Sequence, residues 1–508
     1  MSDQGKLTGK LAVALFASTF GTWFPHGLSV SALNGPQNIV LNWIRSVKCV
    51  RWGGQFAGNY TNNTDLHDPN HYLWCRTIPQ AEEKSLKQNY ELYTLWALCS
   101  SMLCVGALIG TLLTNLFIHG LGIKKSLMLG AVILLAGCVL CSFGPTAGSW
   151  ELFLLGRIVI GLGTGLVTVV TPIYTSEITP AKLRGAAGTL PPVMYVLGLI
   201  VTTAIGFPYV LGHETGWPYL VSAVIIPVVI ACAILPFCPE SPRYLYIEKS
   251  READAQMALM WFRGAGSVKD ELEEMHTEAE HLKGTRNVTL LGLFVDPFLR
   301  KICWLVAVPM LAHQFCGFYC VTFYSTSIFD DVGLKQMDAV YATMGVWVVY
   351  LIALLTSMAL VDRLGRRTLL LISHLGMIVA LVLFVVFAVT REQGVEWTKY
   401  GSAACMPLFI ASFATGSASV PWILPGELFP QEAHNSSASL VAAVSWAGAI
   451  LTTLLFPLIV VVAKHYTFLI FAGLVALATV HIVIKLPETK GKTIEEIQAL
   501  LRSERQTR

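Results

Sequence analysis

The sequence predicts an all-α membrane protein whose twelve transmembrane helices form two pseudo-symmetric halves of six helices. Three observations support this prediction: the composition, the long apolar segments, and short sequences that recur at matching places in the two halves. Hydrophobic residues make up 54% of the 508 residues and charged residues only 13%, whereas about 25% of the residues of a soluble domain are charged. The formal net charge of +3 is too small to indicate a nucleic-acid partner.

Twelve segments are long and apolar enough to cross a bilayer, which takes about 20 residues of helix. The first segment has no small-residue cleavage site after a short apolar core, so we expect a retained helix and not a signal peptide. The spans are expected near residues 11–33, 91–118, 126–144, 151–174, 187–208, 217–237, 301–324, 338–360, 368–390, 401–425, 437–463 and 466–485.

The longest polar stretch divides the chain into two halves. Within it, Leu272, Met275, Ala279 and Leu282 form the apolar stripe of an amphipathic helix that lies against another surface. We therefore predict four regions: an N-terminal six-helix half at 1–237, a cytoplasmic helical linker at 238–297, a C-terminal six-helix half at 298–486 and a cytoplasmic tail at 487–508.

Lysine and arginine residues collect in the loops after spans 2, 4 and 8, and short loops of this kind face the cytoplasm. Both termini are therefore expected to be cytoplasmic and the loop 34–90 extracytoplasmic. This loop carries the N-glycosylation sequons of Asn59 and Asn62, which favour the plasma membrane. It also carries Cys49 and Cys75, which either form a disulfide or remain free thiols.

Three pairs of short sequences recur in the two halves. Glu177-Ile-Thr-Pro after span 4 matches Glu427-Leu-Phe-Pro after span 10. "GLGIKK" (120–125) matches "DRLGRR" (362–367), and "PESPR" (239–243) matches "PETKG" (487–491). These pairs predict two homologous halves with a cavity between them near the middle of the bilayer.

A known family carries the same set of sequences. "YTSEITPAKLRG", "PESPRYL", "FYSTSIF", "DRLGRR" and "PETKGKT", in this order on twelve spans, resemble the sugar-porter branch of the major facilitator superfamily, in particular the animal facilitative hexose transporters. The resemblance covers nearly the whole chain. It implies the major facilitator fold and a uniporter that carries hexoses, with glucose as the default. The alternatives are a transporter of another small polar solute (a polyol, fructose or a urate-like solute) and a non-transporting sugar sensor.

The resemblance also implies a solute site built around span 7. Gln314 matches the second glutamine of the family's pair, His313 stands in place of the first, and Tyr319 stands in place of an asparagine. Other family ligands are replaced, by Pro192 in span 5 and by Ala414 in span 10. The alternative is that His313 and Gln314 only tie span 7 to a neighbouring helix. The predicted solute-binding residues are Gln314, His313, Tyr319, Tyr324, Tyr350, Phe413, Trp422, Ser445 and Trp446.

Charged residues at the cytoplasmic helix ends are candidates for a gate. We expect ion pairs between the halves to close the inner mouth and to break when it opens; the alternative is that these residues are membrane anchors. Two positions depart from the family pattern: Ile123 follows Gly122 where an arginine is usual, and His434 replaces another arginine. The gating residues are predicted to be Glu177, Arg184, Glu240, Arg243, Asp362, Arg366, Arg367 and Glu427.

The sequence predicts transport without a coupling ion. Ser29 stands where the family's proton symporters have an aspartate, and no acidic residue lies in the middle of a span. His26 and His313 could titrate near neutral pH and modulate the rate. Neither a metal site, a cofactor nor an enzyme motif is expected. The stretch "GLGTGL" (161–166) superficially resembles a nucleotide-binding loop, but it lies inside a span and is better explained by helix packing. The expected partners are the solute and membrane lipids.

Overall fold

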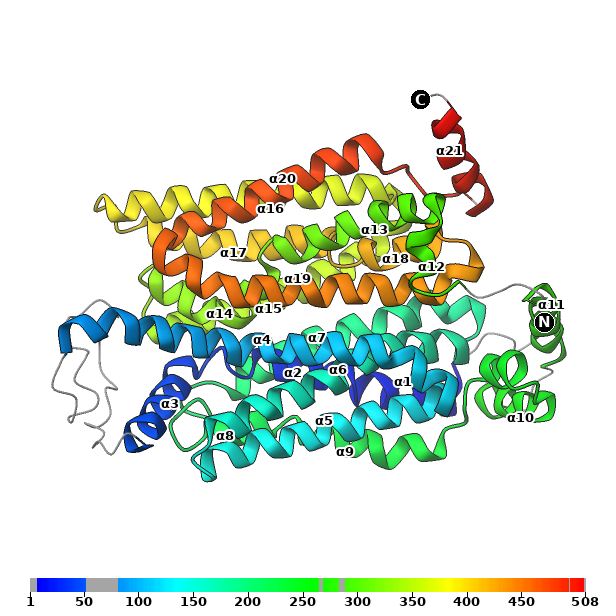
Figure 1. Cartoon of the computed structure of the whole chain (residues 1–508), viewed down its shortest axis with the longest axis horizontal. Coiled ribbons are helices and arrows are strands. Elements are labelled where there is room, and N and C mark those ends of the chain that lie inside the picture. The colour runs from blue at the N-terminus through cyan, green and yellow to red at the C-terminus, as the bar shows by residue number, and fades with distance from the viewer. Residues whose placement is uncertain (1–6, 52–80, 265–267, 283–287, 493, 507–508) are drawn as a thin grey trace.

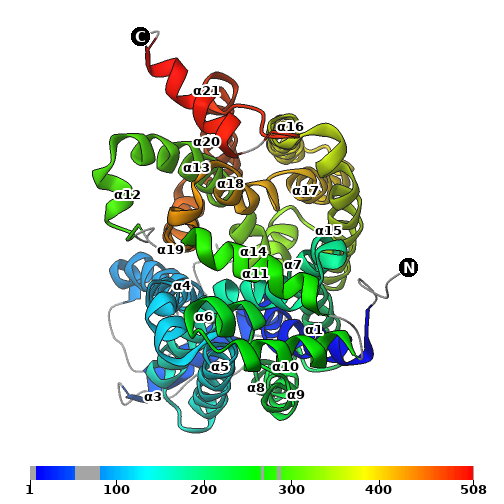
Figure 2. The same cartoon turned by 90° about the vertical axis from the view of Figure 1, so that its right-hand side faces the viewer.

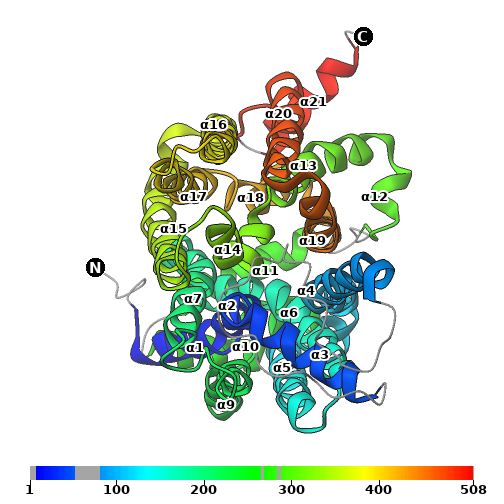
Figure 3. The same cartoon turned by 90° about the vertical axis from the view of Figure 1, so that its left-hand side faces the viewer.

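The computed structural model describes residues 7–51, 81–264, 268–282, 288–492 and 494–506. Within these ranges the regular structure is helical. Figure 1 shows helices running side by side along the long axis, in two groups. Figures 2 and 3, viewed from the two ends, separate the group α1–α9 from the group α13–α20.

The first group contains six spans. Two of them are broken into shorter helices: the first into α1 (Gly9–Phe20) and α2 (Trp23–Ser31), the sixth into α8 (Trp217–Ser222) and α9 (Ile225–Ile234). The other four spans are the helices α4 (Ala81–Leu121), α5 (Ile123–Thr146), α6 (Trp150–Ile178) and α7 (Arg184–Ile205).

The second group also contains six spans, two of them broken, but the broken spans are not all at the same positions. Its first and fourth spans are broken, the first into α13 (Pro297–Phe315) and α14 (Phe318–Asp331), the fourth into α17 (Thr398–Thr415) and α18 (Val420–Leu428). The unbroken spans are α15 (Gln336–Leu364), α16 (Arg366–Glu392), α19 (His434–Ala463) and α20 (Thr467–Lys485).

The described helices account for the twelve predicted spans. Ten helical stretches among the described residues are long and apolar enough to cross a membrane, and one of them, Ser436–Lys485, includes both α19 and α20. The broken helix α1–α2 supplies the remaining span. The predicted fold class is therefore confirmed: the chain is an integral membrane protein with two six-helix halves.

Small residues allow the helices to approach closely. A side chain at Gly161 would place its Cβ 2.0 Å from the carbonyl oxygen of Leu103 on α4, and one at Gly165 would lie 1.9 Å from that of Ala107. Only glycine permits such backbone contact between membrane helices. The "GLGTGL" stretch is therefore a helix-packing surface, as predicted.

One end of the bundle carries additional short helices. Both chain ends lie there, together with η4 (Tyr244–Glu248), α10 (Glu252–Arg263), α11 (Lys269–Leu282) and α21 (Ile494–Gln506), whereas α3 (Gln37–Arg51) lies at the opposite end (Figure 1). Leu272 and Met275 of the predicted stripe pack beside Leu259 and Tyr246. The amphipathic helix in the linker is thus present and lies against α10 and η4.

The short helices attach to different halves. Thr8 before α1 donates to the Phe262 carbonyl of α10 at 2.6 Å, and Arg263 donates to the Ile178 carbonyl at the end of α6 at 2.7 Å. On the other half, Lys301 of α13 donates to the Leu501 carbonyl of α21 at 3.1 Å. The helices α10 and α21 are therefore fixed to different six-helix groups.

Several predictions on the outer loop fall on residues outside the described ranges. Asn59, Asn62 and Cys75 are among them, and the side chain of Cys49 at the end of α3 is likewise not described. Glycosylation and the disulfide therefore remain predictions.

Candidate functional site

The side chain of Asn34 joins the two halves at the end of α2 and at α14. Asn34, which follows α2, donates through Nδ2 to the Thr322 carbonyl at 3.1 Å and to Ser325 Oγ at 2.6 Å. Its Oδ1 accepts the Thr326 backbone N–H at 3.1 Å. The Thr322 carbonyl and the Thr326 N–H are one turn apart, and such groups bond to each other in a regular helix. Asn34 thus binds the backbone of α14 across the contact of the halves.

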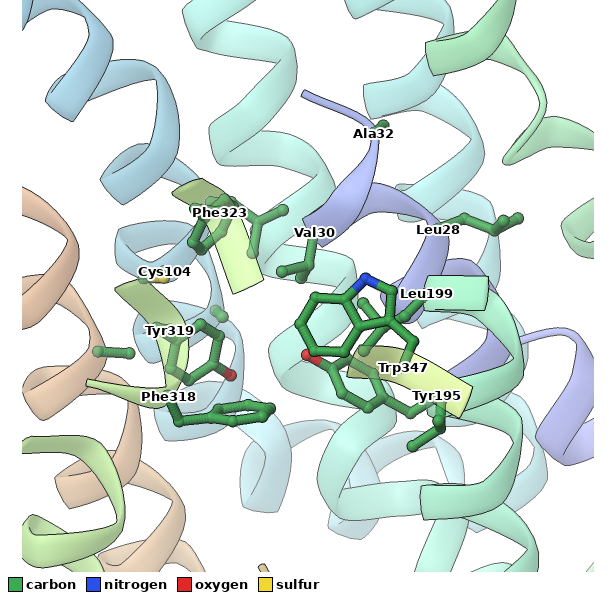
Figure 4. Packing of buried hydrophobic residues seen from close by; sticks show 14 of the residues in the cluster. Leu28, Val30, Ala32, Cys104, Tyr195, Leu199, Phe318, Tyr319, Phe323 and Trp347 are labelled. Atoms are coloured by element: carbon green, nitrogen blue, oxygen red, sulfur yellow. The ribbon is translucent and has the colours of Figure 1, made fainter. Parts of the chain in front are cut away.

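Aromatic side chains from both halves meet in the interior of the protein (Figure 4). Phe318 stacks on Phe413 at a centroid distance of 4.3 Å, and Tyr350 lies 6.1 Å from Phe413. Figure 4 shows Tyr319 facing Tyr195 of the other half, with their phenol oxygens turned toward one another. The predicted residues Tyr319, Tyr350 and Phe413 are therefore brought together in the centre of the protein.

Gln314 lies beside this aromatic cluster on α13. Its Nε2 donates to Ser445 Oγ of α19 at 2.5 Å, while its buried Oε1 has no hydrogen-bond partner among the described residues. Gly448, one turn along α19, allows the close approach, because a Cβ there would lie 2.8 Å from the Gln314 Cβ. Two predicted residues, Gln314 and Ser445, thus contact each other and leave an acceptor available.

Other buried polar atoms in the same region also lack partners. Within the described part of the chain this is true of Trp446 Nε1, Trp347 Nε1 and both ring nitrogens of His26. The rings of His26 and Trp446 lie 5.7 Å apart, and Tyr319 lies 6.3 Å from Trp446. A buried donor or acceptor without a partner is costly, so a group of them at one place is typical of a site for a polar ligand.

His313 is held by the broken helix of span 10. Its Nδ1 lies 2.6 Å from the Ser417 carbonyl, so this nitrogen carries the proton. Ser417 Oγ also lies 2.8 Å from Ser373 Oγ of α16, and Ser357 of α15 donates to the Thr415 carbonyl at 2.6 Å. His313 therefore ties α13 to the break between α17 and α18, in agreement with the structural alternative for this residue.

The remaining predicted solute residues lie at the edges of the cluster. Trp422 of α18 is 39% exposed, and its ring lies 6.5 Å from that of His313. Tyr324 points to α19, where its hydroxyl donates to the Thr453 carbonyl at 3.4 Å and its ring lies 5.2 Å from Phe456. Tyr324 therefore contacts α19 through both its hydroxyl and its ring.

The predicted gating residues form one network in each half, and the network of the C-terminal half is complete. Gly365, at φ 91°, lets the N-terminus of α16 approach Glu488, which accepts the Arg366 backbone N–H at 2.8 Å. The side chain of Arg366 pairs with Glu427 at 2.8 Å, and Thr489 donates to the other Glu427 oxygen at 2.5 Å. A carboxylate at a helix N-terminus is favoured by the unpaired N–H groups and the helix dipole.

The N-terminal half repeats this network with one part missing. Gly122, at φ 99°, brings the start of α5 to Glu240, which accepts the Lys124 backbone N–H at 2.7 Å. Ser241 donates to Glu177, as Thr489 does to Glu427 in the other half. Burial raises the pKa of the Glu240 carboxyl, and the Lys124 N–H opposes this.

The missing part is a cation. Ile123 occupies the place of Arg366 and is buried. Among the described residues no ion pair reaches Glu177, because Arg243 pairs with Glu278 of α11 at 2.7 Å. The pair of Arg366 with Glu427 lies within the C-terminal half, and the pair of Arg243 with Glu278 lies within the linker. Ion pairs between the two halves stay a prediction. Arg184 is exposed at the start of α7, and the side chains of Asp362 and His434 are not described.

One buried charge was not predicted. Arg157 of α6 is 1% exposed; its Nη1 donates to the Ser29 carbonyl at 2.8 Å and its Nε to the Cys99 carbonyl at 3.1 Å. Ser29 lies in the last turn of α2, whose carbonyls lack helical partners, so Arg157 caps this helix close to Asn34. A lone arginine in an apolar span is the signal that could have identified it.

Two bundles of six helices, with unpartnered polar groups and aromatic rings where they meet, define a membrane carrier of the major facilitator type. Solved structures agree on the fold. The xylose transporter XylE from E. coli in a partially occluded inward open conformation matches with a TM-score of 0.73 at 20% identity, over 96% of this chain and 100% of that one. The proton:xylose symporter XylE bound to 6-bromo-6-deoxy-D-glucose matches with a TM-score of 0.74 at 21% identity, over 98% and 100%.

Other relatives have a higher sequence identity to this chain than these structures do. The chain is 32% identical to facilitated glucose transporter member 3 of solute carrier family 2 from Rattus norvegicus, over 97% of this chain and 93% of the relative. It is 32% identical to member 1 from Gallus gallus, over 98% of this chain and 94% of the relative. It is 33% identical to member 2 from Rattus norvegicus, over 98% of this chain and 95% of the relative. The family model "Sugar (and other) transporter" matches residues 76–501. The chain belongs to this family.

Proposed function

We propose that this protein is a facilitative transporter that carries a hexose across the plasma membrane by alternating access, with glucose as the default solute. The relatives named above are facilitated glucose transporters. The observation that carries the proposal is the group of unpartnered polar atoms on His26, Gln314 and Trp446, buried among aromatic rings at the contact of the halves. A sugar needs both polar atoms and aromatic rings in its site, because its hydroxyls require hydrogen-bond partners and its C–H face packs on aromatic rings.

The site is proposed to use Gln314, Trp446 and the aromatic cluster. His313 is proposed to position the break in span 10, since its Nδ1 is bound to the Ser417 carbonyl. Asn34 is proposed as the outer gate, because it joins α2 to α14. The cytoplasmic networks around Glu427 and Glu177 are proposed to rearrange when the inner mouth closes.

The proposed transport is uniport. A proton-coupled carrier needs an acid that titrates in the pathway, and Ser29 donates its hydroxyl to the Pro25 carbonyl of its own helix at 2.8 Å. In proteoliposomes, uptake should stop when the inner and outer solute concentrations are equal, whatever pH gradient is imposed. Accumulation above the outside concentration that a protonophore abolishes would refute uniport.

A second candidate is transport of a less hydroxylated polar solute. It is favoured by the replacement of family amides with Pro192, Tyr350 and Ser445, which leaves Gln314 as the amide beside the aromatic cluster. Uptake of a panel of labelled hexoses, polyols and urate by the reconstituted protein separates the two candidates. Specific binding without uptake would instead support a sugar sensor.

The arrangement in the membrane is part of the proposal. We propose that both termini and the helices α10, α11 and α21 are cytoplasmic, because they lie at one end of the bundle and the lysine- and arginine-rich loops are expected there. The division at 238–297 is proposed as the boundary between the halves. The solute is the proposed partner, and no catalytic activity is proposed.

A further inference from the structure

The most unusual buried group at the contact of the halves is His26. It lies on α2, is 4% exposed, and neither ring nitrogen has a hydrogen-bond partner among the described residues. The other two buried imidazoles among the described residues each have a partner: His313 contacts the Ser417 carbonyl, and His374 Nδ1 lies 2.9 Å from Thr479 Oγ1. Packing alone therefore does not account for a polar ring at this position.

The backbone around His26 fixes where its ring lies. The helices α2 and α7 touch through glycines: a Cβ at Gly27 would lie 2.1 Å from the Tyr195 carbonyl, and one at Gly198 would lie 2.4 Å from the Phe24 carbonyl. This close approach sets the imidazole 4.7 Å from the Tyr195 ring. The side chain therefore has little freedom to turn toward another partner.

The ring of His26 faces the C-terminal half. Its centroid lies 5.7 Å from that of Trp446, whose Nε1 also has no partner within the described residues. The neighbouring residue of Trp446 on α19, Ser445, is the one that Gln314 contacts. His26 thus lies opposite the part of the C-terminal half that carries the proposed solute site.

The hydroxyl groups of Ser29 and Thr22, near His26 in the N-terminal half, already have hydrogen-bond partners. The Ser29 hydroxyl donates to the Pro25 carbonyl, and the Thr22 hydroxyl donates to the Ser18 carbonyl at 2.5 Å and lies 3.0 Å from Thr171 Oγ1. Pro192 offers no polar side-chain atom. The hydroxyl of Tyr195, whose ring lies 4.7 Å from that of His26, also lacks a partner among the described residues. His26 and Tyr195 are therefore neighbouring groups on this side with free hydrogen-bonding capacity, and His26 is the one that offers two ring nitrogens.

We propose that His26 binds a hydroxyl group of the transported sugar and helps to select it. A neutral imidazole offers one donor and one acceptor, and a hydroxyl can use either. The rings of His26 and Trp446 are in contact in this state, with centroids 5.7 Å apart. The sugar would therefore bind between them when the two halves move apart, and it would then contact both halves. This inference rests on the proposed sugar transport and adds a ligand from the N-terminal half.

The test is saturable uptake of D-glucose and of monodeoxy-D-glucoses by the reconstituted full-length protein. His26→Phe keeps a planar ring but removes both nitrogens, so KM should rise about tenfold while kcat changes less than twofold. His26→Gln, which retains a donor and an acceptor, should recover most of the affinity. The wild type should discriminate against the sugar that lacks the bound hydroxyl, and His26→Phe should lose this discrimination.

The matched control is His374→Phe, because His374 is a buried membrane histidine between α16 and α20, away from the contact of the halves. Its KM should equal that of the wild type. If His26→Phe does not reach the membrane, His26→Met makes the same comparison. A His26 variant with unchanged KM and unchanged deoxy-sugar discrimination overturns the inference, whereas a wild type that carries no hexose overturns the proposed function.

Discussion

At the scale of single residues, Gln314 connects the predicted site to the observed one. Its Nε2 is used by Ser445 and its Oε1 is free to accept a hydrogen bond. The side chain can therefore satisfy its neighbour and bind a sugar hydroxyl at the same time. His313, predicted beside it as a second ligand, binds the Ser417 carbonyl through Nδ1, and its role as a ligand stays a prediction.

We predict that Gln314→Ala abolishes saturable hexose uptake while surface expression stays intact. The change removes the acceptor and leaves Ser445 Oγ without its donor, and losing a hydrogen bond in a buried site costs about 1–3 kcal/mol. The apparent affinity should therefore fall at least about tenfold for each lost bond, which moves uptake out of the saturable concentration range. Uptake kinetics and cell-surface labelling measure the two effects. The control is Gln393→Ala, because Gln393 is an exposed residue at the end of a helix. Unchanged uptake kinetics for Gln314→Ala would show that the role of Gln314 is purely structural.

At the scale of helices, the contact that is proposed to close the outer end joins Asn34 to α14. Three hydrogen bonds join them, and a net contribution of about 1 kcal/mol for each would favour the closed outer end by about 3 kcal/mol. Asn34→Ala should therefore shift the carrier toward an outward-open state. The measurement uses Ser31→Cys as the site of labelling. A membrane-impermeant thiol reagent added outside should label Cys at this position at least about tenfold faster when Asn34→Ala is also present than when Asn34 is intact.

Asn38→Ala serves as the matched control for this experiment, because Asn38 is an exposed asparagine four residues further along the chain. It should not change the labelling rate of Ser31→Cys. Equal labelling of the Asn34 and Asn38 variants would show that Asn34 does not hold the outer end closed.

The networks around Glu427 and Glu177, proposed to be cytoplasmic, differ at the position held by Arg366 in one half and Ile123 in the other, and this difference can be tested. We predict that Ile123→Arg pairs with Glu177 as Arg366 pairs with Glu427. Thermal unfolding of the single and double variants of Ile123→Arg and Glu177→Gln should then yield a coupling free energy of about 1 kcal/mol or more. The native pair Arg366 and Glu427 is the positive control, and additive effects at Ile123 and Glu177 would contradict the assignment.

At the scale of the whole molecule, the orientation in the membrane determines which end is extracellular. We predict that a glycosidase increases gel mobility and that Asn59→Gln with Asn62→Gln removes this shift. Asn287→Gln should change nothing, because its sequon is expected in the cytoplasmic linker. A shift that depends on Asn287 would invert the proposed topology.

The sequence by itself determined the twelve spans, the two related halves and the linker helix. Each follows from properties that are local in the chain: the apolar length needed to cross a bilayer, the repeated short sequences, and the periodicity of Leu272 and Met275. The glycine-rich stretch of α6 was also assigned correctly, because small residues in an apolar span indicate helix contact.

The tertiary structure alone decided which polar groups meet. Asn34 binds α14 from 288 or more residues away, and Arg157 caps α2. His313 binds the Ser417 carbonyl at the break in span 10. His26 was noticed in the sequence only as a group that could titrate, and its place opposite Trp446 emerged from helix packing. The physical reason is that membrane helices satisfy their polar side chains through partners on other helices, and a sequence does not specify which helix faces come together.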